Sequence, residues 1–244
     1  MKTRAREGGF TLVEIAIVLV IIGLLLGGIL KGQELITSAR VRNLADQGAA
    51  VQAAYYGFVD RYRAIPGDMS AANACAAIGT AVLTGCNTNP GGDANGRIDS
   101  GDFGEAAAVW AHLSAAGFLQ GTYLGTANDV GDYTNPAAPT RAPTNPWNGS
   151  LLLARTNGYL VPGGTGPLRL HLIIGREIPV NVMRELDVKI DDSAPGSGVL
   201  RAPAATGTAF DSVGDDDGTC VTTTTPPTWN ITPASVDCNG YYLF

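Results

Sequence analysis

The densest group of candidate metal ligands lies in the segment DANGRID, residues 93–99. Asp93, Asn95 and Asp99 alternate with other residues around a central glycine, and Asp102 and Glu105 follow them, which is how calcium loops place oxygen atoms around a hard cation. The EF-hand template fails, because a glycine falls on its first ligand position when the central glycine is aligned. Asp-x-Asn-Gly is also a strong turn signal by itself. A calcium site and a plain turn both remain open, and no other cofactor is expected.

Residues for covalent or acid–base catalysis are scarce. The chain has no G-x-S-x-G, H-E-x-x-H, P-loop or dinucleotide fingerprint, and its two histidines leave little room for a multi-histidine metal site. His112 lies in a predicted helix and His171 in a predicted strand, where structural roles are expected. The net charge of −6 argues against broad electrostatic binding of nucleic acid. We therefore expect neither an enzyme nor a nucleic-acid partner.

The apolar residues are concentrated at the start of the chain, over residues 10–30. This run carries a single charge, Glu14, and is long enough to span a bilayer as a helix. The basic residues Lys2, Arg4 and Arg6 precede it, which favours a cytoplasmic N-terminal end. A secretory signal peptide would require an Ala-x-Ala-like cleavage site after the apolar run, and the sequence has none there. The pattern predicts a membrane segment that continues as a helix.

The residues at the border of this span form the pattern GFTLVE, residues 9–14. This resembles the prepilin cleavage and methylation motif of type IV pilins and type II secretion pseudopilins. The resemblance implies that a prepilin peptidase cuts between Gly9 and Phe10 and methylates Phe10, and that Glu14 is the assembly glutamate of that family. The alternative is a single-pass signal anchor in which Glu14 is incidental.

Glu14 also has a physical argument of its own. A carboxylate in the hydrocarbon region costs about 2.5–3.5 kcal/mol on insertion scales and usually pairs with another group. The next basic residue is Lys31, so the nearest cation would be the amine of Phe10 that cleavage frees. In a bundle of offset identical helices, Glu14 of one subunit can meet the Phe10 amine of the next. This pairing predicts an assembly role for Glu14.

The chain divides into four expected parts. Residues 1–9 form a leader peptide, 10–30 the transmembrane half of a long helix, 31–66 its amphipathic half, and 67–244 a globular head. Apolar residues from Leu35 to Tyr62 recur at steps of three and four, which is typical of an amphipathic helix. The sequence Ile-Pro-Gly that follows predicts its end.

The head is rich in glycine and proline and is expected to contain short elements. Helices are predicted over residues 69–78 and 104–117 and from Pro179 onward, with strands over residues 150–154, 158–161, 168–174, 199–202 and 240–244. With the family resemblance, the expected fold is α+β and type IV pilin-like, with the long N-terminal helix packed on a loop-rich head that contains an antiparallel sheet. The segments YRAIPGDM, GDANGRID and LDVKIDD also resemble a loosely defined group of larger prepilin-like proteins.

All four cysteines, Cys75, Cys86, Cys220 and Cys238, lie in the head. An even number outside the cytoplasm implies disulfides, and four cysteines allow three connectivities. We expect the sequence-local pairs Cys75–Cys86 and Cys220–Cys238. The second pair would close a loop near the C-terminus, and the resemblance to pilins implies such a disulfide-closed C-terminal region.

The resemblance implies a structural subunit that polymerises with itself or with other pilins. Its expected partners are the prepilin peptidase and methyltransferase and an inner-membrane assembly platform. The expected location is the bacterial inner membrane, then a surface filament or a periplasmic pseudopilus. The first alternative is a minor pilin or tip adhesin whose head binds a surface, a polymer or DNA, and the second is a membrane-anchored periplasmic enzyme. The leader leaves open whether the machine serves a pilus, secretion or DNA uptake.

Overall fold

The structure is a computed structural model that describes residues 11–79, 83, 91–134, 140–204, 220–232 and 235–244. The chain divides into the units Met1–Arg40 and Val41–Phe244, which we describe separately. Helix α1, Leu12–Tyr62, supplies residues to both of them.

The described part of the first unit is helical from Leu12 to Arg40. Large apolar side chains from Leu12 to Leu30 are all exposed, with exposed fractions between 46% at Ile22 and 87% at Leu12. Within the described residues, α1 is the one helix whose length and composition would allow it to cross a membrane. The side chains of Leu35 and Ile36, further along, are exposed as well.

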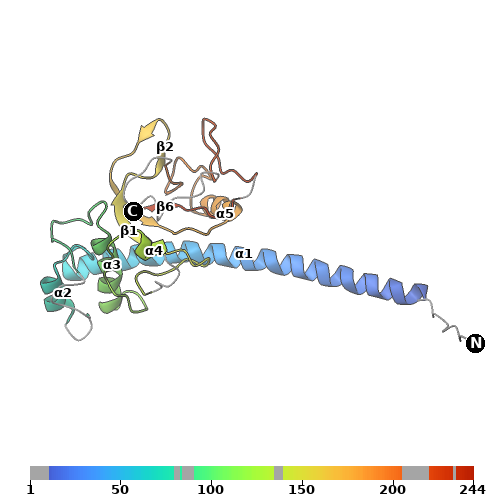
Figure 1. The fold of residues 1–244 in the computed structure, drawn as a ribbon, viewed down its shortest axis with the longest axis horizontal. Helices are drawn as coiled ribbons and strands as arrows, with labels where there is room; N and C mark the ends of the chain where they lie inside the picture. The colour runs from blue at the N-terminus through green and yellow to red at the C-terminus, as the bar shows by residue number, and fades with distance from the viewer. Residues whose placement is uncertain (1–10, 80–82, 84–90, 135–139, 205–219, 233–234) are drawn as a thin grey trace, which may run out of the picture. The chain divides into compact units, whose positions relative to one another are not determined.

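The second unit begins where α1 becomes amphipathic. Its buried residues recur at helical spacing and are Val41, Leu44, Gly48, Val51, Ala54, Tyr55 and Phe58. The other helices are α2 (Ala71–Ile78), α3 (Phe103–Ala115), the short α4 (Gly131–Thr134) and α5 (Val180–Ile190) (Figure 1). Ser70 caps α2 and Asp102 caps α3, each by accepting a backbone N–H of the first turn.

The described residues form a four-stranded antiparallel sheet in the order β1-β4-β6-β5. Its strands are β1 (Leu152–Thr156), β4 (Arg169–Ile173), β6 (Tyr241–Leu243) and β5 (Leu200–Arg201). The small strands β2 (Leu160–Val161) and β3 (Gly164–Thr165) pair separately as a hairpin. Three of the four residues at Leu151–Ala154 are leucines and all are fully buried, so β1 lies at the centre of the head core.

Aromatic side chains join α1 to the rest of the second unit. The Tyr55 ring lies edge-on to that of the C-terminal Phe244, with centroids 5.9 Å apart. The Phe58 ring contacts Phe118 at 6.2 Å and stacks on the His112 ring of α3 at 6.3 Å. These contacts bury the amphipathic part of α1 against the head.

The chain leaves α1 through a turn that only glycine fits. Gly67 has φ +92°, and a Cβ there would come within 2.6 Å of the Glu105 carbonyl oxygen on α3. The Gly67 N–H donates to His112 Nδ1 at 2.9 Å. The turn expected at Ile65-Pro66-Gly67 therefore brings the backbone close to α3 and holds it there.

A disulfide joins Cys220 to Cys238, the pair that local closure predicts, with the two Cα atoms 5.8 Å apart. The loop that it closes contains Trp229, whose Nε1 donates to Asp187 Oδ2 of α5 at 2.6 Å. Cys75 is also disulfide-bonded, whereas Cys86, its expected partner, lies outside the described residues.

The α+β, pilin-like fold class is confirmed by the long N-terminal helix and the antiparallel sheet. The elements expected over residues 69–78, 104–117 and 168–174 and from Pro179 onward are present as α2, α3, β4 and α5, with ends shifted by one or two residues. β1 covers Leu152–Thr156, two residues further along the chain than the strand expected over residues 150–154. α4 and β3 were not expected, because elements of four and two residues are too short to show periodicity.

His171 supplies a pH-dependent test of the fold. It is fully buried on β4, between the rings of Tyr159 and Tyr241. Burial, as the largest cause, lowers its pKa from 6.5 to about 4. The unfolded chain therefore binds a proton more readily, and folding stability should fall as the pH is lowered from about 6.5 toward 4.

The substitution His171→Phe keeps a ring between the two tyrosines and removes the titrating group. We expect urea unfolding of this variant to lose part of the pH dependence found in the wild-type protein between pH 6.5 and 4. Equal pH dependence in both proteins would contradict the assignment.

Candidate functional site

Glu14 lies in the first turn of α1 and closes a capping box. Its Oε2 accepts the backbone N–H of Thr11 at 2.8 Å and the Thr11 hydroxyl at 2.7 Å. In return, the Glu14 N–H donates to Thr11 Oγ1 at 3.3 Å. This reciprocal pattern satisfies donors that the helix start would leave free. Glu14 therefore fixes the beginning of α1, in addition to any contact it makes with a neighbour.

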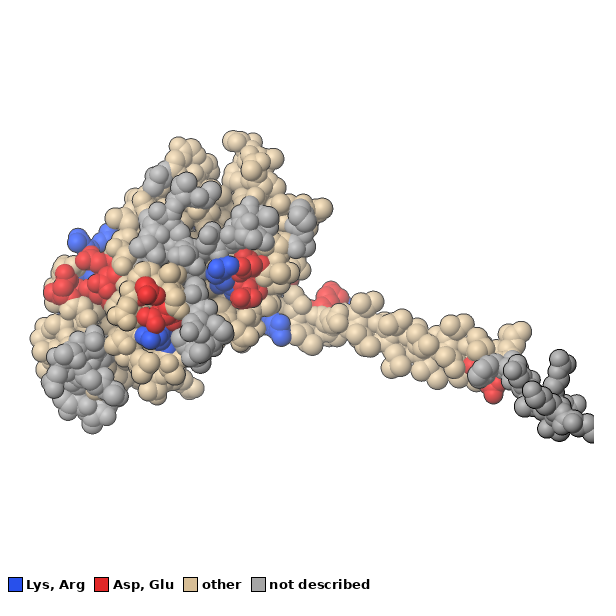
Figure 2. All heavy atoms as spheres, viewed as in Figure 1, with Lys and Arg blue, Asp and Glu red and all other residues tan. Residues whose placement is uncertain are grey.

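The surface beside Glu14 is apolar and uncovered. Figure 2 shows this stretch of α1 almost entirely without basic or acidic side chains. Such a continuous apolar surface is stable only against lipid or against other apolar helices. Gly9 and Phe10, the expected cleavage and methylation residues, lie outside the described residues and stay predictions.

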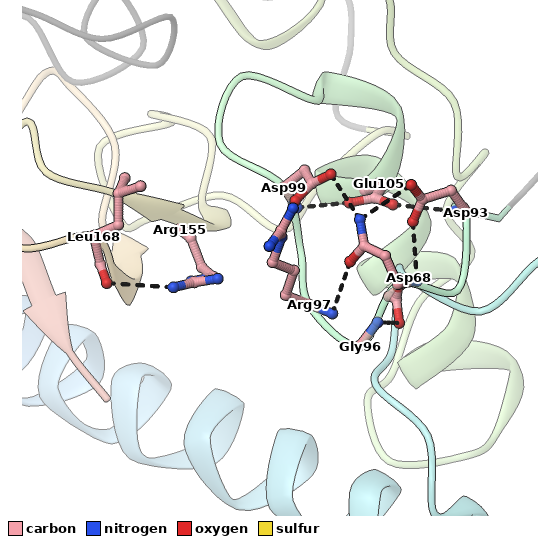
Figure 3. A network of polar contacts seen from close by, with 9 residues as sticks. Asp68, Asp93, Gly96, Arg97, Asp99, Glu105, Arg155 and Leu168 are labelled. Carbon is pink, nitrogen blue, oxygen red and sulfur yellow. Dashed lines mark hydrogen bonds and ion pairs between the residues drawn. The ribbon is translucent and has the colours of Figure 1, made fainter.

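The candidate calcium segment brings three of its four named residues together. Asn95 Nδ2 donates to Asp93 Oδ2 at 3.0 Å and to Asp99 Oδ2 at 2.8 Å (Figure 3). The fourth residue, Asp102, instead caps α3, where its Oδ1 accepts the Glu105 N–H at 3.0 Å. Asp102 therefore caps the helix, and the segment is held instead by two residues that lie outside it.

Those residues are Asp68 and Glu105, whose side chains are only 4% and 2% exposed. The two Asp68 oxygens accept the N–H groups of Asn95 at 2.8 Å and Gly96 at 3.0 Å. The two Glu105 oxygens accept the N–H groups of Asp93 at 3.3 Å and Asp99 at 2.6 Å. The segment is thus wrapped around two buried carboxylates, as Figure 3 shows.

The electrostatics of this site differ from its centre to its edge. Burial raises the pKa of Glu105, against the hydrogen bonds that it accepts. At the exposed edge, hydrogen bonds from Arg97 and then Asn95 lower the pKa of Asp99, and the same contact raises the pKa of Arg97. Arg97 and Asp99 form an ion pair there.

One carboxylate oxygen each from Asp68, Asp93 and Glu105 lies within 4.8 Å of the others. This donor set suits a hard cation such as calcium. However, the oxygens of all three carboxylates accept a hydrogen bond from the chain itself. The carboxylates therefore already serve to hold the loop by hydrogen bonds. This geometry supports a plain turn more directly than a calcium site.

The sequence did not identify Asp68 or the central position of Glu105. Asp68 lies 27 residues from the Asn95 that it binds, so no local spacing connects them. A local signal did exist for Glu14, because Thr11-Leu12-Val13-Glu14 has the spacing of a capping box. The capping box and the assembly role are separate properties of the same residue.

Within the described residues, both histidines are buried in structural positions. His112 Nδ1 accepts the Gly67 N–H, and His171 Nδ1 contacts the Arg169 carbonyl oxygen at 2.7 Å. Neither contact places a base beside a nucleophile, which acyl-transfer chemistry would require.

Asp68 tests whether the network holds the head together. In Asp68→Ala, the Gly96 N–H loses its acceptor, while the Asn95 N–H keeps Asp93 Oδ1 as its other acceptor. A hydrogen bond to a charged group contributes about 1.5–3 kcal/mol, so the free energy of unfolding should fall by about that much. Urea denaturation measures the change.

The matched control is Asp60→Ala on α1, because the Asp60–Arg63 ion pair is well exposed on both sides and contributes little. A loss in Asp68→Ala no larger than in the control would show that the network does not stabilise the fold.

Comparison with known proteins connects the N-terminal segment to a family. Residues 4–30 match the model of the prokaryotic N-terminal methylation motif. No match was found among curated proteins or among solved structures. The matched residues include Glu14 and the exposed apolar stretch described above. The chain therefore carries the prepilin signature of type IV pilins and pseudopilins, which supports a pilin- or pseudopilin-like subunit.

Proposed function

We propose that the chain is a structural subunit, a pilin or pseudopilin, that polymerises into a type IV pilus-like extracellular or periplasmic filament. The methylation motif together with the uncovered apolar surface of α1 carries this proposal. Before assembly, the apolar stretch anchors the subunit in the inner membrane. The prepilin peptidase and methyltransferase and an inner-membrane assembly platform are the proposed partners.

Burial of apolar surface supplies the driving force for assembly. In the membrane, lipid covers the side chains from Leu12 to Leu30. Outside it, the same surface would face water, where each buried leucine, isoleucine or valine side chain is worth about 1.5–3 kcal/mol. Packing of identical helices in a head-to-tail arrangement covers that surface and continues without closing, which gives a filament.

Glu14 sets the register of neighbouring subunits in this proposal. Cleavage between Gly9 and Phe10 frees the Phe10 amine one residue before Thr11, whose N–H and hydroxyl already bind Glu14. In a staggered bundle, the carboxylate of one subunit pairs with the amine of the next. The pair neutralises both charges where water is excluded, so misplaced subunits are disfavoured.

The head forms the outer surface of the filament and has no enzymatic role. Its disulfide and its carboxylate-held loops suit a stable domain outside the cytoplasm. A minor or tip position in the filament is the alternative role for the same subunit.

Mass spectrometry of the mature N-terminus tests the processing step. We expect the membrane-extracted chain to begin with N-methylated Phe10. A mature chain that still begins at Met1 would exclude the pilin proposal.

Substitution of Glu14 tests the assembly step. In Glu14→Val, membrane insertion should persist while the yield of sheared filaments falls strongly, because the Phe10 amine of the neighbour loses its partner. The matched control Thr11→Ala removes the hydroxyl of the capping box and keeps the carboxylate, so its filament yield should stay close to that of the wild type. Normal yield in Glu14→Val, or an equal loss in both variants, would overturn the pairing. Electron microscopy of the same cells, with and without the gene, separates a main subunit from a minor one.

A further inference from the structure

The head contains four Asn-Gly pairs, which are Asn95–Gly96, Asn148–Gly149, Asn157–Gly158 and Asn239–Gly240. Asparagine is a thermolabile residue, and a glycine after it leaves the backbone nitrogen unshielded because it has no side chain. In such a pair, the glycine nitrogen can attack the side-chain carbonyl carbon of the asparagine. The fold decides which of the four pairs can complete this reaction.

Three of the pairs are protected by burial of the glycine as well as by hydrogen bonds. These glycines are buried and donate their N–H groups to side-chain oxygens, Gly149 to Asn145 Oδ1 at 3.0 Å, Gly158 to Thr156 Oγ1 at 2.9 Å and Gly240 to Asn239 Oδ1 at 2.6 Å. Water, which the reaction needs for its last step, has little access to a buried glycine. The three pairs are therefore expected to be stable in the folded head.

The fourth pair is different, because both Asn95 and Gly96 are exposed. Its protection depends on one contact, in which the Gly96 N–H donates to Oδ2 of the buried Asp68 at 3.0 Å (Figure 3). Attack requires the Gly96 nitrogen to lose its proton, and the negative charge of Asp68 beside it disfavours the anion that would form. Asp68 therefore holds back the nucleophile at the one pair whose glycine water reaches.

The Asn95 side chain is also held in place. Its Nδ2 donates to Asp93 Oδ2 at 3.0 Å and to Asp99 Oδ2 at 2.8 Å. Its Oδ1 accepts the Arg97 N–H at 3.1 Å. Hydrogen bonds to two carboxylates are stronger than neutral ones, so the amide has little freedom to reorient toward the Gly96 nitrogen.

We propose that Asn95 is the site at which the folded head is covalently modified, by deamidation, and that Asp68 controls the rate of this reaction. In the first step, the Gly96 nitrogen forms a bond to Asn95 Cγ. The bond between Cγ and Nδ2 breaks, and Nδ2 leaves as ammonia with the proton that the glycine nitrogen gives up. Water then opens the resulting succinimide ring at either carbonyl carbon, which leaves aspartate or isoaspartate at position 95. No oxidant or reductant takes part.

The modification releases the loop that the network holds. Loss of Nδ2 removes the donor that Asp93 and Asp99 share. The new carboxylate places a further negative charge beside these two, and like charges at hydrogen-bond distance repel. The nearby Arg97 already pairs with Asp99. Residues 93–99 therefore pass from a held to a released state, and the covalent change makes that state permanent.

The test follows deamidation of the full chain in detergent at mildly alkaline pH by peptide mass spectrometry. Asp68→Ala frees the Gly96 N–H, so Asn95 should be converted about ten- to hundredfold faster than in the wild type, the factor that corresponds to a hydrogen bond to a charged group. The matched control Asp60→Ala removes an exposed aspartate of α1 and should leave the wild-type rate unchanged.

A second variant and the other Asn-Gly pairs separate local release from unfolding. Asp68→Asn keeps an oxygen acceptor without the charge, so its rate should lie between those of the wild type and Asp68→Ala. The three buried pairs should stay unmodified in every folded variant. If Asp68→Ala does not fold, all four pairs react together, and the comparison of Asp68→Asn with the wild type decides.

Equal rates at Asn95 in the wild type and in both Asp68 variants would overturn the proposal. A slower reaction in the folded Asp68→Ala variant would do so too, because the carboxylate would then act as a base and not as a restraint. Modification of a buried pair before Asn95 in the folded protein would show that exposure of the glycine does not select the site.

Discussion

The apolar surface of α1, which is unfavourable in water, constrains this protein more than any other feature. The side chains from Leu12 to Leu30 are exposed and can be covered only by lipid or by other apolar helices. The single charge in that stretch, Glu14, starts the helix through its capping box with Thr11. One residue thus links the local start of α1 to the proposed register between subunits, and the two roles are compatible because a carboxylate has several acceptor sites.

The head depends on a different interaction, in which buried or half-buried carboxylates hold irregular backbone. Its described strands are at most five residues long, so strand pairing satisfies few backbone N–H groups. Asp68, Glu105 and Asp191 each accept at least two such groups from loops. Charge-assisted hydrogen bonds of this kind are stronger than neutral ones and can replace part of a ladder. The loops are therefore as specifically built as the sheet.

Prediction from sequence succeeded where apolar residues recur at helical spacing or where proline and glycine mark the end of a helix. The amphipathic part of α1, the alanine-rich α3 and the helix after Pro179 all show helical spacing, and Ile65-Pro66-Gly67 marks the end of α1. It was incomplete where the evidence is a contact between distant residues. Asp102 was grouped with the calcium candidates although it caps α3, and the role of Asp68 depends on a partner 27 residues away.

By itself, the sequence determined the apolar span, its lone glutamate and the prepilin motif, because these follow from composition and short-range spacing along one chain, and the fold class followed from the family resemblance that the motif carries. Only the tertiary structure decided which carboxylates are buried and which loops they hold. The physical reason is that burial and hydrogen bonding of a side chain depend on all the segments folded around it. Trp229 and Asp187 illustrate this, since they are 42 residues apart in the chain and share one hydrogen bond in the fold.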